Sequence, residues 1–199
     1  MPKLSLADFI DVVSKAGSPK ITKVREIKKR DNYSPATDFY RPFRQGVVSL
    51  HSRDQPRSAL DSIAVSLTDV KKMTNYPELI EGYKKWWGRK DLEWFEPPRG
   101  TYSSAGFDVA VNPELGLKIN GRRHIIKLYN KADPITKFRI DLVPLLMELT
   151  LRPGAQPDDV MALLDVRRGK LYVLSINQAV GKAGLDAELA YISNLWPHL

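Results

Sequence analysis

The chain has 199 residues, of which 43% are hydrophobic and 27% are charged, a composition typical of a soluble globular protein. This length is enough to bury a sizeable core in one domain, or in one domain with an extension. The chain has no cysteine, which excludes disulfides, thiolate nucleophiles and cysteine-ligated metal centres.

The sequence shows no sign of export or membrane insertion. No apolar run approaches the roughly 18 residues that a membrane span needs. The N-terminal stretch MPKLSLADFIDVV carries acidic residues among its apolar ones and lacks the small-residue cleavage site of a secretory signal. We therefore expect a cytoplasmic protein that does not cross a membrane.

The formal net charge is +8 and the pI is near 9.6. A basic surface attracts phosphate groups and steers polyanions toward the protein, so nucleic acid is the leading candidate partner. The alternative is that the excess of lysine only keeps the protein in solution.

The first predicted helix covers residues 5–17. Ser5 and Asp8 form a capping-box-like start, apolar residues recur at helical spacing, and Gly17 ends the helix.

A basic segment, residues 18–31, follows this helix. Its apolar residues would allow a strand with one solvated face, and its charge would also suit a mobile basic arm or a solvated connector. If the segment contacts a ligand, the charge predicts an anionic one. Its cationic candidates are Lys20, Lys23, Lys28, Lys29 and Arg30.

Residues 39–75 have a helical pattern in two pieces. A further helix is predicted over residues 77–90, with Pro77 in its first turn, and it carries Glu81. Pro97 and Pro98 then interrupt the pattern. We therefore predict a mainly helical region, residues 1–96, followed by an α/β core domain, residues 97–199, or one continuous domain made of both.

The second half of the chain is rich in predicted strands. Asn120-Gly121 is the strongest hairpin signal, and Pro144 is expected to kink or shorten the helix that contains it. The fold class is α+β, or mixed α/β, with a central sheet of β-hairpins flanked by helices. The predicted strands are 102–112, 115–119, 124–129, 160–166 and 170–176, and the predicted helices are 134–151 and 186–196.

The order of helix, three strands, helix and strand in residues 77–176 resembles the core of the restriction-endonuclease-like superfamily, the PD-(D/E)XK nucleases. In that superfamily a second-strand aspartate and an acid two residues before a third-strand lysine hold a metal ion and the attacking water. The resemblance implies that Asp108 is the first acid, Lys127 the lysine and Glu81 an additional glutamate from the helix. The implied cofactor is Mg²⁺, which lowers the pKa of its bound water.

The sequence departs from the motif at one position. Residues two apart in a strand share a face, so the acid that partners Lys127 should stand at position 125, which is Ile125 in the segment HIIKLY. Either Glu114 on the preceding strand substitutes, or the metal site is absent and the fold binds without cutting. The candidate catalytic residues are Asp108, Glu114 and Lys127, and the candidate metal ligands are Glu81, Asp108 and Glu114.

Each of these residues also has a structural interpretation. Asp108 suits a half-exposed strand, Glu114 suits a turn after Pro113, and Lys127 can extend its stem over an apolar surface. A lysine buried alone in an apolar strand would cost several kcal/mol, so Lys127 should meet an acid, a ligand or the surface.

These patterns predict a nucleic-acid-associated protein with a nuclease-like core. The alternative is a non-catalytic module for protein interaction or self-association. Hairpin tips that carry paired basic residues suit phosphate contact. Besides the basic segment, the candidate phosphate contacts are Arg122, Arg123, Arg167, Arg168 and Lys170.

Overall fold

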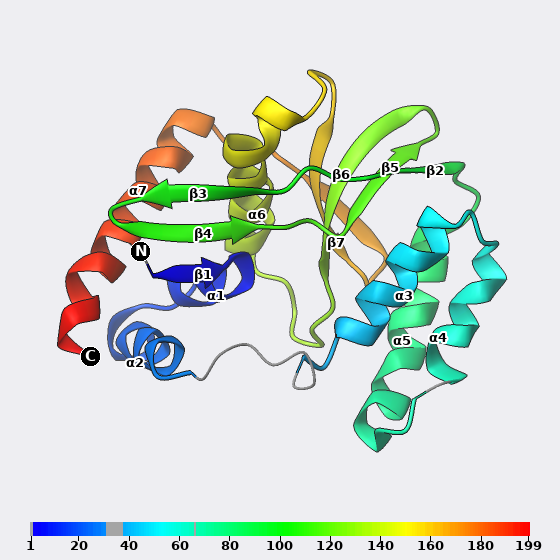
Figure 1. The fold of residues 1–199 in the computed structure, drawn as a ribbon, viewed down its shortest axis with the longest axis horizontal. Coiled ribbons are helices and arrows are strands. Elements are labelled where there is room, and N and C mark those ends of the chain that lie inside the picture. Colours follow the sequence, from blue (N-terminus) through cyan, green and yellow to red (C-terminus); the bar gives the residue numbers. More distant parts are fainter. Residues whose placement is uncertain (1, 31–37, 66) are drawn as a thin grey trace.

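The computed structural model describes residues 2–30, 38–65 and 67–199, which form an α+β structure with helices packed around two β-sheets (Figure 1). This confirms the predicted fold class. The helices are α1 (Leu6–Val13), α2 (Gly17–Lys28), α3 (Arg41–Ser52), α4 (Ser62–Val65), α5 (Val70–Trp87), α6 (Lys137–Leu151) and α7 (Gln178–Leu195), with 3-10 turns at Arg57–Asp61, Arg152–Gly154 and Trp196–His198. The strands are β1 (Lys3–Ser5), β2 (Leu92–Phe95), β3 (Gly100–Ser104), β4 (Phe107–Val111), β5 (Leu115–Ile119), β6 (Arg122–Tyr129), β7 (Val160–Asp165) and β8 (Lys170–Val173).

The larger sheet has five strands in the order β2-β5-β6-β7-β8. Neighbouring strands are antiparallel except β6 and β7, which are parallel because α6 makes a crossover between them. The β5–β6 turn is the predicted Asn120-Gly121 hairpin, and both residues have the positive φ that this tight turn requires, 47° and 89°.

The smaller sheet has three strands in the order β1-β4-β3. The prediction of one strand over residues 102–112 was wrong, since Ala105 and Gly106 adopt positive φ and turn the chain into the β3–β4 hairpin. Strand β1 was not predicted, because three residues are too few to show an alternating pattern. It pairs with β4 in parallel.

Strand β2 also went unpredicted, and it lies inside the region 1–96 that we expected to be mainly helical. Leu92 pairs with Ile119, so β2 forms an edge of the larger sheet. The prolines that follow it, Pro97 and Pro98, therefore stand between the two sheets and not before the first strand.

Apolar residues cover both faces of the larger sheet. Ile125 and Leu163 belong to a cluster with α1, α6, α7 and the smaller sheet. Ile126 and Leu164 point to the opposite face and pack with α3 and α5. The sheet is thus the middle layer of the molecule, with α6 on one side and α3 and α5 on the other (Figure 1).

Three further predictions about segments need correction. The basic segment 18–31 is neither a strand nor an arm: residues 17–28 form α2, which buries Val24, and residue 31 lies outside the described part of the chain. Pro144 does not shorten its helix, since α6 continues past it to Leu151. Helix α7 begins at Gln178, well before the predicted start at 186, because Asn177 caps its N-terminus, and β8 ends at Val173. Within the described residues, no helix is both long and apolar enough to cross a membrane.

Candidate functional site: a basic cleft around Lys127 and Glu114

The lysine in the middle of β6 is paired with an acid. Leu115 pairs with Ile126 in the β5–β6 register, so Glu114, the residue before β5, lies opposite Lys127. Lys127 Nζ donates to Glu114 Oε1 at 2.6 Å and to the carbonyl oxygen of Asn112 at 2.9 Å. The other carboxylate oxygen accepts from the backbone N–H of Leu128 at 2.8 Å. The prediction that Lys127 meets an acid is confirmed.

The position two residues before Lys127 offers no second acid. Ile125 is fully buried in the apolar cluster below α6. The polar pair of Lys127 and Glu114 therefore lies at the border of this cluster, with side-chain exposures of 20% and 12%. Together these residues make one ion pair, not the two-acid arrangement of the nuclease motif.

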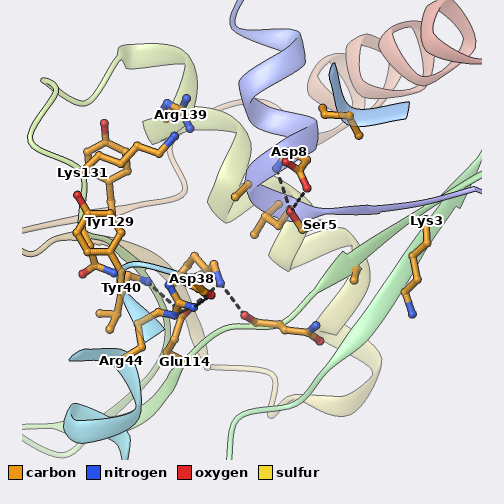
Figure 2. A pocket seen from close by; sticks show the side chains of 18 of the residues that line it. Lys3, Ser5, Asp8, Asp38, Tyr40, Arg44, Glu114, Tyr129, Lys131 and Arg139 are labelled. Carbon is orange, nitrogen blue, oxygen red and sulfur yellow. Dashed lines mark hydrogen bonds and ion pairs between the residues drawn. The ribbon is translucent and has the colours of Figure 1, made fainter. Parts of the chain in front are cut away.

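A second cation shares the same carboxylate. Arg44 on α3 places Nε 3.6 Å from Glu114 Oε1 and also forms an ion pair with Asp38 (Figure 2). Glu114 thus joins α3 to the strand pair β5–β6. Its charge is balanced by two basic side chains from different parts of the chain.

These residues line a cleft of about 650 Å³ (Figure 2). Its acidic lining residues are Asp8, Asp38 and Glu114. Its basic lining residues outnumber them and come from five helices and strands or the residues next to them: Lys3, Arg30, Arg44, Lys127, Lys131 and Arg139.

Two of these basic residues share an acid that is not itself a lining residue of the cleft. Lys131 and Arg139 both form ion pairs with Asp11 of α1. Burial raises the pKa of Asp11, but the hydrogen bond from Arg139 and the charge of Lys131 outweigh it and hold that pKa below its ordinary value. Two cations facing one carboxylate leave a surplus positive charge here.

The last two basic lining residues, Lys3 and Arg30, come from the N-terminal part of the chain. Arg30 forms an ion pair with Asp8 at 2.9 Å. Lys3 on β1 is exposed, and its ammonium group has no ion pair with a carboxylate in the described part of the chain. The cleft is therefore net positive.

The three carboxylates proposed as metal ligands lie apart. Asp108 is in the smaller sheet, accepts a hydrogen bond from Ser103 Oγ at 2.6 Å and does not line the cleft. Glu81 lies in a separate hollow and pairs with Lys84. The described residues include no cluster of three or more His, Asp or Glu able to hold a metal ion. Among the described residues, Glu81, Asp108 and Glu114 are therefore not brought together into one group.

Asp108 and Glu114 are separated by the sheet topology. Strand β4, which carries Asp108, pairs with β1 and β3 in the smaller sheet, whereas Glu114 comes directly before β5 of the larger sheet.

Several candidate phosphate contacts are committed to internal interactions. Arg167 is buried and donates Nε to the carbonyl oxygen of Asn130, and Arg168 pairs with the buried Asp165. Arg123 pairs with the buried Asp159.

Three lysines of the basic segment are also used in internal interactions. Lys20 pairs with Glu188, and Lys23 pairs with Glu26. Lys28 donates to the carbonyl oxygens of Trp196 and Leu199.

Of the candidate phosphate contacts, Arg30 alone lines the cleft, while Lys29, Arg122 and Lys170 are exposed elsewhere. Sequence reasoning missed Lys3, Arg44, Lys131 and Arg139. Nothing in their local sequence distinguishes them, because the fold brings them together from distant segments.

The ion pair between Lys127 and Glu114 leads to a stability prediction. Lys127→Met should lower the free energy of unfolding by about 1–3 kcal/mol, because it leaves the poorly exposed carboxylate of Glu114 with one less cation. The double variant Lys127→Met/Glu114→Gln should recover part of this loss, since the amide still accepts the N–H of Leu128. Urea unfolding of the parent, both single variants and the double variant gives the coupling energy. Additive effects would show that the two side chains do not interact.

Comparisons with known proteins give no family for the chain. No protein-family model matches it, and a search of curated proteins finds no match.

Proposed function

We propose that the protein binds nucleic acid through the basic cleft, with no hydrolytic step assigned to it. The observation that supports this proposal is the gathering of six basic side chains, from Lys3 near one end of the chain to Arg139, around one hollow that contains three acids. Phosphate contacts by Lys and Arg are the main source of affinity for nucleic acids. A cytoplasmic location fits such a partner.

The arrangement of the larger sheet also supports a nuclease-like core. Elements α5, β2, β5, β6, α6 and β7 follow one another as helix, three sheet strands, helix and strand, with the β3–β4 hairpin inserted after the first strand. Lys127 occupies the third of these strands. With Ile125 at the second acid position and Glu114 bonded to Lys127, we propose binding as the role of this core.

Binding can be measured by fluorescence anisotropy with a labelled oligonucleotide. Lys3→Gln/Lys131→Gln should weaken binding about tenfold or more at low salt, because two charge-assisted contacts are lost. The variant should also reduce the slope of log K against log salt by about 1.4 for a single strand. Both side chains suit substitution, since Lys3 has no ion pair with a described carboxylate and Asp11 keeps Arg139.

The matched control is Lys29→Gln/Arg122→Gln, which also removes two positive charges, but from exposed positions outside the cleft. It should change the affinity by less than about twofold. Equal weakening by both double variants would show that only the overall charge attracts the ligand, and the assignment to the cleft would be wrong.

Binding should not require a divalent metal, because the proposed contacts are ammonium and guanidinium groups. We expect the same dissociation constant in EDTA and in Mg²⁺, within about twofold. Gel analysis of the oligonucleotide after incubation with Mg²⁺ or Mn²⁺ adds a second readout. Cleavage that disappears in Lys127→Ala would instead identify a metal-dependent nuclease.

An interaction module for a protein partner or for self-association is the second candidate. It is favoured by apolar side chains near the start of α5, where Val65, Val70 and Met73 are 83%, 75% and 53% exposed. Such an interface responds little to salt, whereas binding to several phosphates weakens steeply as salt rises. Sedimentation at two salt concentrations would detect self-association.

A further inference from the structure

We infer that the cleft accepts a single strand of nucleic acid and not a duplex. This inference rests on the proposed function and specifies its ligand. Three features of the cleft support it: its size, the presence of cations on opposing walls, and the aromatic ring at its edge.

The size of the cleft suits one or a few nucleotides. Its volume of about 650 Å³ lies inside the range of roughly 300–1,000 Å³ in which proteins enclose small ligands. A single DNA-binding module, by contrast, contacts a duplex over roughly 600–1,000 Å² of protein surface, usually with a helix or ribbon that enters a groove. The cleft is instead a hollow lined by residues from several helices and strands.

The cations stand on opposing walls. Lys3 and Arg30 belong to the N-terminal elements, β1 and the end of α2, whereas Arg44 belongs to α3 on the other side of β6 (Figure 1). Lys131 and Arg139 complete the lining next to Tyr129 (Figure 2). A ligand in the cleft meets cations from more than one side. This arrangement suits a single strand, because its phosphates and its bases are separately accessible. In a duplex the bases are stacked inside and the phosphates lie on the outside.

An aromatic ring lines the same space. Tyr40, just before α3, is partly exposed, and its ring and that of Phe39 form a perpendicular pair with centroids 4.9 Å apart. This contact fixes the orientation of the ring, so that stacking a base on it requires little further ordering. Aromatic rings beside a basic groove are the usual means by which proteins bind single strands without reading their sequence.

The experiment compares a fluorescein-labelled single strand of about 20 nucleotides with the blunt duplex of the same sequence. The single strand should bind at least about fivefold more tightly at equal salt. Tyr40→Leu, which keeps an apolar side chain but removes the aromatic face, should weaken single-strand binding at least about fivefold, and Tyr40→Phe should retain it. Tyr172→Leu is the control, because Tyr172 is a partly exposed ring on β8 outside the cleft.

The outcomes separate this inference from the proposed function. If the duplex binds as tightly as the single strand and Lys3→Gln/Lys131→Gln still weakens it, the cleft binds nucleic acid but the inference is wrong. The inference also fails if Tyr40→Leu binds the single strand as tightly as Tyr40→Phe. If neither oligonucleotide binds, both proposals are wrong.

Discussion

Replacement of Gly82 by alanine is expected to lower the free energy of unfolding by roughly 3 kcal/mol. Gly82 lies on the buried side of α5, where a Cβ atom would stand 2.1 Å from the carbonyl oxygen of Val166 and 2.7 Å from that of Arg167. Both atoms belong to backbone, so the contact cannot be relieved by rotating a side chain. Overpacking of this kind typically costs about 1–3 kcal/mol and occasionally more, and a rigid neighbour at this distance places it above that range, so that roughly 3 kcal/mol remains after the gain of about 0.5–1 kcal/mol in helix propensity from alanine.

The turn that Gly82 faces is held in place from several directions. The buried guanidinium of Arg167 donates to the carbonyl oxygen of Asn130, to Asn75 and to Glu78, which ties the β7–β8 turn to α5 and to the end of β6. Gly169 in the same turn has a φ of 60°, a conformation that glycine adopts without strain. The turn therefore has little freedom to move away from an added methyl group.

Gly184 provides the matched control, since it also lies inside a helix, α7, but has no atom within 4 Å of an added Cβ. Gly184→Ala should stabilise the protein by about 0.5–1 kcal/mol through the higher helix propensity of alanine. Urea unfolding followed by circular dichroism measures both variants. A Gly82→Ala protein as stable as the parent would show that α5 does not approach the turn as closely as described.

The pairing of Lys127 with Glu114 illustrates what the sequence can determine. The two-residue turn at Asn120-Gly121 fixes the register of β5 and β6, and counting outward from that turn brings Glu114 opposite Lys127. No long-range information is needed, because the two residues are joined by one hairpin. The periodic helices and the β7–β8 hairpin also depend on residues close together in the sequence. This explains why the sequence predicted their type of structure correctly.

The position of Asp108 illustrates what the sequence cannot determine. Whether β4 joins β5 in one sheet or starts another depends on β1 and β2, two short strands with little pattern of their own. Because both strands were missed, β4 was expected to lie in one sheet with β5 and β6, whereas it pairs with β1 and β3 in the smaller sheet. The error comes from long-range pairing, which local periodicity does not report.

The basic candidates show a related limit. A guanidinium that could bind phosphate also satisfies buried carbonyl oxygens and carboxylates, as Arg167 and Arg123 do. Sequence clustering of cations therefore does not separate structural from ligand-binding side chains. The cations of the cleft are instead scattered along the chain and meet only in the folded structure.

The second large effect concerns pH and a buried histidine between α3 and α5. His51 is 6% exposed, and its Nε2 lies 2.7 Å from the hydroxyl of the fully buried Tyr83. Its ring also packs on Trp87, with centroids 4.7 Å apart. Burial lowers the pKa of His51 from 6.5 to about 4, since the charged imidazolium would lose its hydration. Among the described residues no carboxylate forms an ion pair with it.

This depressed pKa makes stability fall as the solution is acidified. Below pH 6.5 His51 becomes protonated in the unfolded chain, whereas in the folded chain it stays neutral down to about pH 4. The native state therefore loses stability across that interval. The loss should reach about 2 kcal/mol at pH 5 and about 3 kcal/mol at pH 4, relative to pH 7.5. Above pH 6.5 the contribution is fully present and does not change further.

Urea unfolding at a series of pH values between 4.5 and 7.5 tests this expectation, with the parent and His51→Gln compared at each pH. The amide of glutamine can still bond to the hydroxyl of Tyr83 but does not titrate, so the variant should have the flatter profile, and subtraction cancels the contribution of the carboxylates. His124→Gln is the control: burial lowers the pKa of His124 as well, but its ring is less buried, and this variant should keep most of the slope. A His51→Gln profile parallel to that of the parent would mean that His51 is protonated in the folded protein as readily as in the unfolded chain. The conclusion that α3 and α5 pack around a neutral imidazole would then be wrong.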